Sequence, residues 1–325
     1  MNIVPFDENH IGEAGELLFK AYQTERAAVP VLPDCGDAGF FAHMASELCG
    51  NGLGVAAVEE GRLQGFLTGM EAGELFGTSS GIYIPVYGHA VKGRDRQNTY
   101  QQLYAGASDI WVRKGLFSHA ITMYAHDKTA VNAWFWQDFG LRCVDAIRSL
   151  DNIQVRGKES FDIRRIEPSE AGILLELHRE HWRYYKSAPM FMHVQEDCTL
   201  EELQDWLTEE NQYAFAAFEN GVPAAYMQLR NSGETFVSAD AMSMNICGAY
   251  VKPGLRGAGY GAAILQTIVD WLREKGFSRL GVDYESFNIQ GSRFWQKHFT
   301  AFTYSLTRRI DERTAGKWDI PMIGS

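Results

Sequence analysis

The chain has 325 residues and a mass of 36.5 kDa, which is too long for one ordinary domain and suits two. Hydrophobic residues make up 46% and charged residues 22%, a composition that argues against a disordered or fibrous protein. The formal net charge of -11 argues against a broad nucleic-acid surface and favours cationic or amine-bearing ligands, so we expect no nucleic-acid partner.

Cysteine usage and hydropathy indicate a soluble protein of the cytoplasm. No uninterrupted apolar stretch approaches the ~18 residues that cross a bilayer, and the first residues lack a basic region. The five cysteines are odd in number, and no two of them form a CxxC pair. We therefore expect reduced thiols, no bound metal and no membrane association.

Two hairpins are predicted about 160 residues apart. The first covers 55–66 with a Glu-Gly turn, and the second covers 214–226 with Asn220 and Gly221 at its turn. An Asn-Gly pair between apolar runs is a strong hairpin signal. The two halves of the chain therefore share a local pattern.

Matching helices and strands follow each hairpin. Each predicted helix is closed by a glycine and followed by a strand: helix 100–114, Gly115 and strand 118–124, then helix 261–275, Gly276 and strand 279–284. A Phe-Trp-Gln run then falls in a short helical stretch of each half, which pairs Trp136 with Trp295. Each half thus predicts hairpin, strand, helix, strand, helix and strand, an α/β arrangement of the α+β mixed-sheet kind. The polar stretch 151–160 between them is the best domain boundary.

The most informative segment is a strand, a Pro-Gly turn, a glycine cluster and an amphipathic helix over 243–265. Glycines at 257, 259 and 261 leave backbone N–H groups unobstructed where the helix begins, an arrangement that suits a phosphate. Arg256 would add a charge-assisted contact. The run lacks the Gly-Lys-Ser/Thr of a Walker loop, and too little chain follows it for a dinucleotide fold. A glycine turn with a purely structural role is the remaining alternative.

Segment 251–261 resembles the acyl-coenzyme A pyrophosphate loop of the GNAT acetyltransferase superfamily. Segment 288–297 resembles the Asn, small, apolar, aromatic, Lys run that precedes the last strands of that family. In the first half, Gln97 and Thr99 stand where the loop needs glycines, so that half resembles the family in outline only. We expect a degenerate GNAT-like domain without a coenzyme site over 1–152 and an acetyltransferase domain over 160–325.

The resemblance implies two tandem domains, each a mixed, splayed central sheet flanked by helices. It also implies acetyl-CoA as co-substrate, held partly by the main chain of the fourth strand, with a backbone N–H facing the thioester carbonyl. The implied cofactor-binding residues are Ala249, Tyr250, Val251, Arg256, Gly257, Ala258, Gly259, Tyr260, Gly261, Ala262, Asn288 and Trp295.

Acetyl transfer to an amine needs a neutral nucleophile, and a lysine-like amine has a pKa of ~10.4. Asp283 and Glu285 alternate with apolar residues near the end of a strand, so both carboxylates share one face, toward either the cleft or solvent. Trp295 occupies the position where the family commonly has a Tyr general acid. Tyr284 and Tyr304 are candidate replacements, or the thiolate leaves without a dedicated acid.

Other residues with reactive or polar side chains are expected to have structural roles. Asn245 and Cys247 are further cleft candidates, but the apolar strand around Cys247 favours a small buried side chain. His178 and His181 are expected on a surface helix, without a metal. The aromatic run 134–136 is expected to pack in a core.

The sequence therefore predicts an N-acetyltransferase that moves an acetyl group from acetyl-CoA directly to a small-molecule or peptide amine. A non-catalytic acyl-CoA sensor or scaffold is the alternative. A third hypothesis makes the first domain a platform for a protein or aminoacyl-RNA acceptor.

Overall fold

The computed structural model describes residues 1–157, 161–194 and 198–314. The chain divides into two compact units. Unit 1 comprises Met1–Pro30, Asp34–Cys143 and Phe302–Ser325, and unit 2 comprises Val31–Pro33 and Val144–Ala301. Two parts of the sequence-based prediction lie outside the described residues. They are residues 158–160 at the predicted domain boundary and residues 315–325 at the end of the predicted second domain.

The two units do not coincide with the two halves of the sequence. Strand β8 (Gly140–Ser149) passes from unit 1 into unit 2, and strand β14 (Thr300–Arg309) from unit 2 into unit 1. The predicted division at 152 and 160 assigned each strand to its own half. The local hydrophobic pattern predicts where a strand lies in the sequence, but its pairing with other strands decides to which sheet it belongs.

Unit 1 holds the remaining elements of the first half. They are β1 (Asn2–Pro5), α1 (Ile11–Ala28), α2 (Ala38–Ser46), β2 (Val55–Glu59), β3 (Arg62–Leu67), β4 (Met70–Ala72), β5 (Gly81–Ile84), β6 (His89–Val91), α3 (Arg96–Arg113), β7 (Ser118–Tyr124) and α4 (Lys128–Phe135). Its strands pair in the orders β1-β2-β3-β6 and β4-β5-β7-β14. The predicted hairpin over 55–66 is confirmed as β2 and β3, with Glu60 and Gly61 at the turn.

Two tryptophans lie in the core of unit 1. Trp111 is fully buried and donates from Nε1 to the carbonyl of Leu53 at 2.8 Å, and Trp134 is fully buried among aromatic rings. Phe135 and Trp136 are 65% and 68% exposed, so the prediction that the run 134–136 packs in a core is wrong for these two. A short helix turns only one face to a core, and α4 turns Trp134 inward.

Unit 2 holds the elements of the second half. They are β9 (Asp162–Ile166), α5 (Gly172–Lys186), α6 (Leu200–Thr208), β10 (Tyr213–Glu219), β11 (Val222–Arg230), β12 (Ser243–Val251), α7 (Tyr260–Glu274), β13 (Arg279–Glu285) and α8 (Ile289–His298). The strands pair in the order β8-β13-β12-β11-β10-β9. The Asn-Gly hairpin is confirmed as β10 and β11, with positive φ at Asn220 and Gly221.

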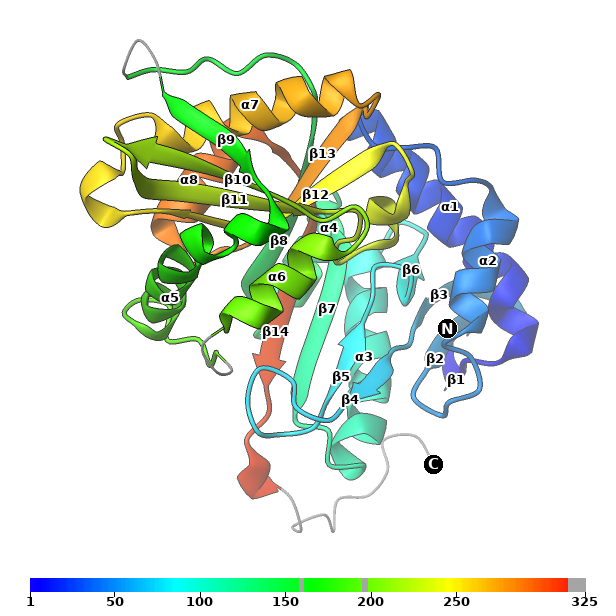
Figure 1. Ribbon diagram of the computed structural model, residues 1–325. Helices are drawn as coiled ribbons and strands as arrows, with labels where there is room; N and C mark the ends of the chain where they lie inside the picture. Colours follow the sequence, from blue (N-terminus) through cyan, green and yellow to red (C-terminus); the bar gives the residue numbers. More distant parts are fainter. Residues whose placement is uncertain (158–160, 195–197, 315–325) are drawn as a thin grey trace. The chain divides into compact units, whose positions relative to one another are not determined.

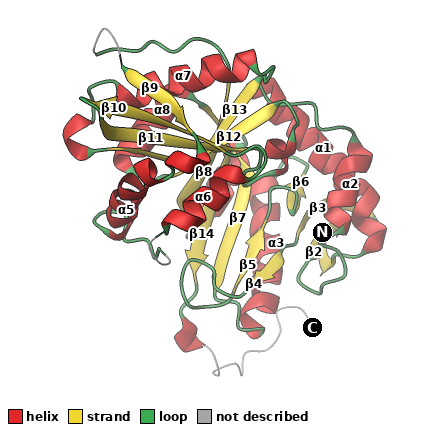
Figure 2. Ribbon diagram, in the orientation of Figure 1, coloured by secondary structure: helices red, strands yellow, loops and turns green. Residues whose placement is uncertain are grey.

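Helices cover both faces of the unit 2 sheet (Figures 1 and 2). On β10, Tyr213 and Phe215 pack against Trp271 of α7, with ring centroids 4.6 and 5.6 Å apart. The alternate residues Ala214 and Ala216 belong to the core cluster formed with α5 and α6. Successive side chains of a strand point to opposite faces of the sheet, so β10 packs against α7 on one face and against α5 and α6 on the other. The predicted mixed α/β fold is confirmed.

Among the described residues, no helix combines the length and apolarity needed to cross a bilayer.

Candidate active site

The candidate site lies where two parallel strands of unit 2 separate. β12 and β13 are paired from Ser243 with Arg279 to Ile246 with Val282. β12 continues to Val251 while still paired with β11, and β13 continues to Glu285. Beyond the paired stretch, one edge of β12 borders a cavity of about 1120 Å³. Backbone groups along such an edge can bond to an extended ligand.

A β-bulge marks the point of separation. Gln228 pairs with Gly248 and Leu229 with Ile246, which leaves Cys247 as the extra residue on β12. Cys247 is exposed and lines the cavity, so the prediction of a small buried side chain is wrong. Desolvation in the recess, together with the nearby carboxyl of Asp283, raises the pKa of the thiol to about 12. The thiol is therefore protonated at neutral pH.

The glycine turn forms one end of the cavity. A 3-10 turn over Pro253–Leu255 leads to Gly257 and Gly259, both with positive φ, and α7 begins at Tyr260 without a side-chain cap. A Cβ on Gly257 would meet open space, whereas a Cβ on Gly259 would overlap the carbonyl oxygen of Arg156. The turn thus presents uncapped N–H groups and the positive end of the α7 dipole to a cavity.

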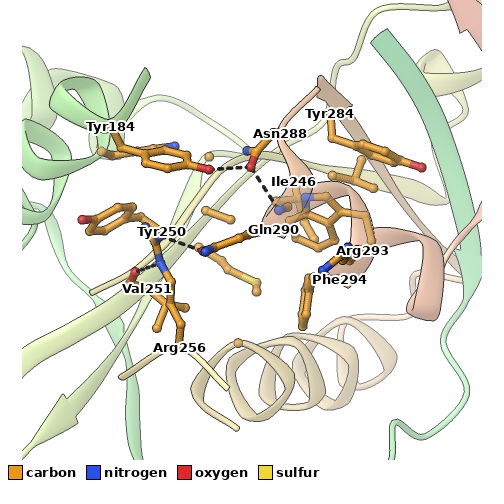
Figure 3. A pocket seen from close by; sticks show the side chains of 18 of the residues that line it. Tyr184, Ile246, Tyr250, Val251, Arg256, Tyr284, Asn288, Gln290, Arg293 and Phe294 are labelled. Carbon is orange, nitrogen blue, oxygen red and sulfur yellow. Dashed lines mark hydrogen bonds between the residues drawn. The ribbon is translucent and has the colours of Figure 1, made fainter. Parts of the chain in front are cut away.

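Hydrogen bonds to a backbone carbonyl and to a side-chain amide hold Arg256 at this end of the cavity. Its Nε donates to the carbonyl of Val251 at 3.0 Å, and a terminal nitrogen donates to Oε1 of Gln290 at 2.7 Å (Figure 3). Its guanidinium also lies 4.9 Å from the centre of the Tyr184 ring. The positive charge is therefore fixed beside the glycine turn.

Asn288 connects two helices across the cavity. Its Oδ1 accepts the N–H of Gly291 at 3.1 Å, which caps α8, and the hydroxyl of Tyr184 at 2.8 Å (Figure 3). Tyr184 lies on α5, more than a hundred positions earlier in the chain. Sequence analysis did not identify Tyr184, because no motif links an aromatic on one helix to the cap of another.

The two candidate base residues both line the cavity. Desolvation is the main cause that raises the pKa of Asp283 from 3.8 to about 6, and the carboxylates of Glu234 and Glu285 raise it further. A carboxylate with a pKa near neutrality can accept a proton and release it again. Of the two open orientations, the face shared by Asp283 and Glu285 is therefore the one toward the cleft.

The residues considered as proton donors differ in their surroundings. Tyr284 is 4% exposed and lines the cavity. Tyr304 packs against the core of unit 1. Trp295 is 7% exposed, lines the cavity and has ring contacts with Phe294 and Phe299.

The histidines on α5 are buried, so the expectation of a surface helix with incidental histidines is wrong. His178 stacks on the ring of Tyr226 at 4.7 Å, and Nδ1 of His181 lies 2.8 Å from the Tyr226 hydroxyl. Burial lowers the pKa of His178 to about 4 and that of His181 to about 3, so both are neutral. The strong amphipathic pattern of α5 was the available signal, because these positions fall on its apolar face.

Asp283, Tyr284, Glu285 and all of the predicted cofactor-binding residues except Ala258 line this one cavity, whereas the further candidates Asn245 and Tyr304 do not. Residues that sequence analysis did not single out contribute as well. Among them are aromatic side chains of α5 and cationic side chains around the glycine turn and on α8: Trp182, Tyr184, Tyr185, Arg156, Arg293 and Lys297.

Unit 1 contains a turn with an arginine contact similar to that of Arg256. Arg96 donates from Nε to the carbonyl of Val91 at 2.9 Å, as Arg256 does to Val251, but it also forms an ion pair with Asp127. The carboxylate of Asp95 caps α3 by accepting the N–H of Asn98 at 3.4 Å. In unit 1, by contrast with unit 2, the arginine is ion-paired and the helix that starts at it is capped by a carboxylate.

Aligning the Phe-Trp-Gln runs pairs Asn288 with Thr129, but the helix caps pair Asn288 with Asp127. Asp127 caps α4 as Asn288 caps α8, and this register pairs the buried Trp134 with the buried Trp295. Aligning the Phe-Trp-Gln runs, which pairs Trp136 with Trp295, is therefore wrong by two residues.

Comparison with known proteins supports this fold. Residues 174–299 match the family described as "Acetyltransferase (GNAT) family". A search of curated proteins found no match. The GCN5-related N-acetyltransferase of Sphaerobacter thermophilus is similar in structure, with a TM-score of 0.57, 13% identity and 95% of each chain covered. A GCN5-related glucosamine N-acetyltransferase region in a fungal multi-domain GH3 β-N-acetylglucosaminidase gives a TM-score of 0.51 and 15% identity, covering 94% of this chain and 38% of the other.

The match of residues 174–299 and the structural similarity support a GNAT-like fold.

Proposed function

We propose that unit 2 binds acetyl-CoA and transfers the acetyl group directly to an amine in a ternary complex. The observation that carries this proposal is the uncapped start of α7, which opens into the same cavity as the half-buried carboxylate of Asp283. The uncapped helix start suits a bound diphosphate, and the carboxylate suits the removal of a proton from an amine.

The donor end of the cavity fits the phosphates of coenzyme A. The open space beside Gly257 leaves room at the helix start, and the guanidinium of Arg256 is already oriented by Val251. The exposed edge of β12 from Ala249 to Val251 offers main-chain bonds to the pantetheine amides. Acetyl-CoA supplies the activated acyl group, and a β12 N–H that faces the thioester carbonyl would stabilise negative charge there.

The acceptor end needs a base for the amine. Asp283 takes this role, with Glu285 beside it, because its raised pKa allows proton uptake near neutral pH. Tyr284, which follows Asp283 in the chain, is the candidate general acid, and Trp295 cannot serve as the general acid. A leaving thiol has a pKa of ~8.5, so the thiolate can also take its proton from water.

Unit 1 is, in this proposal, a degenerate copy that binds no coenzyme A. Its arginine is neutralised by Asp127 and its helix start is capped by Asp95.

The test is coenzyme A release with a thiol reagent, measured for the full chain with acetyl-CoA and a panel of amines. Asp283→Asn should lower turnover without loss of coenzyme A binding by calorimetry. Turnover that is unchanged in Asp283→Asn would remove the base assignment.

The presence of Trp295 at the acid position favours one alternative, a non-catalytic acyl-CoA sensor. Tight binding of acetyl-CoA with no thiol released for any amine would establish that alternative and overturn the enzymatic proposal.

A further inference from the structure

The cationic and anionic residues that line the cavity come from different elements. The Lys and Arg side chains come from the loop between β8 and β9, the glycine turn and α8: Arg156, Arg256, Arg293 and Lys297. The carboxylates that line it are Asp283 and Glu285, at the end of β13. If the anionic donor takes the cationic end, as in the function proposed above, the carboxylate end is left for a cation.

The wall contributed by α5 is aromatic and uncharged. Trp182 and Tyr185 line the cavity beside His181, with ring centroids 5.9 and 4.7 Å from the imidazole and 6.0 Å from each other. His181 is neutral because burial lowers its pKa to about 3. Met227 of β11 and Met192 add thioether side chains to the same cavity. Flat apolar groups pack well against such a surface.

The aromatic wall is held in place by hydrogen bonds. His181 is fixed through Nδ1 to the hydroxyl of Tyr226 at 2.8 Å, and the N–H of Met192 donates to the carbonyl of Tyr185 at 2.9 Å. Tyr184, next to Tyr185, is tied to Asn288. A preorganised wall loses little conformational entropy when a ligand binds.

The aromatic wall and the carboxylates belong to the same cavity. Cys247, the extra residue at the β12 bulge, lines this cavity as well. A ligand in the cavity can therefore place an amine at Asp283 and an apolar group against the α5 wall.

We propose that the acceptor is a primary amine carried on a flat aromatic group, with the amine at Asp283 and the ring against Trp182 and Tyr185. This proposal rests on the function proposed above and narrows it to a substrate class. A polyamine or an aminoglycoside would bring several ammonium groups, and the described lining offers only two carboxylates to receive them.

The test compares 2-phenylethylamine, n-butylamine, spermidine and kanamycin at saturating acetyl-CoA, using the full chain. Since a hydrophobic pocket discriminates about 10- to 200-fold for small apolar differences, we expect kcat/KM for 2-phenylethylamine to exceed that for n-butylamine at least about tenfold. Trp182→Leu should bring this ratio close to one while leaving the KM for acetyl-CoA unchanged.

Trp136→Leu is the matched control, because Trp136 is 68% exposed in unit 1 and does not line the cavity. It should leave the ratio unchanged. If Trp182→Leu fails to bind coenzyme A, Tyr185→Leu provides the same test on a second wall residue.

Two different failures are distinguishable. Turnover of n-butylamine, spermidine or kanamycin at least as efficient as that of 2-phenylethylamine overturns the substrate class and leaves the acetyltransferase intact. Binding of acetyl-CoA without turnover of any amine overturns the proposed enzymatic function, and the acceptor class with it.

Discussion

Asp127 and Asn288 occupy equivalent positions and differ in charge. Each caps the short helix that follows the strand, with Oδ1 accepting an N–H three residues on at 3.1 Å: from Ala130 in unit 1 and from Gly291 in unit 2. In unit 1 the carboxylate also pairs with the loop arginine, whereas in unit 2 the arginine contacts a neutral amide, that of Gln290. The change of charge at this position thus accompanies the difference between a closed and an open turn.

We predict that one coenzyme A binds per chain. The donors of the unit 1 turn are engaged by Asp95 and Asp127, and a second anion would have to displace these carboxylates. Isothermal titration calorimetry should give a stoichiometry of one. A second site of comparable affinity would contradict the assignment of unit 1 as a closed copy.

Arg256→Ala should weaken coenzyme A binding by about 1.5–3 kcal/mol, roughly 10- to 150-fold, because a hydrogen-bonded charge is lost from the diphosphate site. Arg96→Ala is the matched control, since Arg96 makes the same bond to the valine that ends its strand. Calorimetry on both variants checks this prediction. Equal losses in the two would indicate a general effect on folding.

Gly257 and Gly259 should respond differently to substitution. A Cβ at Gly259 would overlap the Arg156 carbonyl, so Gly259→Ala should destabilise unit 2, and the melting temperature should fall markedly. Gly257 has a φ of +80° with open space around its Cβ position, and asparagine tolerates this region. Gly257→Asn should therefore fold, yet bind coenzyme A weakly because its side chain enters the helix-start site. A Gly257→Asn protein that binds coenzyme A normally would exclude a ligand from that space.

The kcat/KM for the amine should fall more steeply below about pH 6, by a further tenfold per pH unit, because Asp283 must be ionised to accept a proton and its pKa in the free protein is about 6. Desolvation raises this pKa most, the carboxylates of Glu234 and Glu285 raise it further, and Arg230 lowers it. A pH profile of the wild type should show this inflection, and Asp283→Asn should lack it. An inflection that persists in the variant would assign it to another group.

The same pKa predicts a stability effect. The folded state holds the Asp283 proton more tightly than the unfolded chain, so the stabilising contribution of the protonated carboxyl is lost as pH rises from about 4 to about 6. Asp283→Asn should consequently be more stable than the wild type at pH 8, by roughly 1–3 kcal/mol. Thermal unfolding at pH 4 and pH 8 tests this, since the difference should be small at pH 4. A variant that is less stable at pH 8 would show that the buried charge is compensated.

Sequence alone was sufficient for features governed by neighbouring residues. The two hairpins, the helices closed by Gly115 and Gly276, and the uncapped glycine turn before α7 all follow from turn chemistry and periodicity. The candidate base face on β13 follows from strand alternation. In each case the residues that decide the structure lie within a few positions of one another.

The tertiary structure alone decided which distant elements meet. In the tertiary structure Tyr184 of α5 contacts Asn288, and Trp182 and Tyr185 line the cavity. Cys247 is exposed at a bulge, and β8 and β14 each have residues in both units. These outcomes depend on pairing and packing between segments far apart in the chain, and the free energies of such contacts leave no local pattern in the sequence.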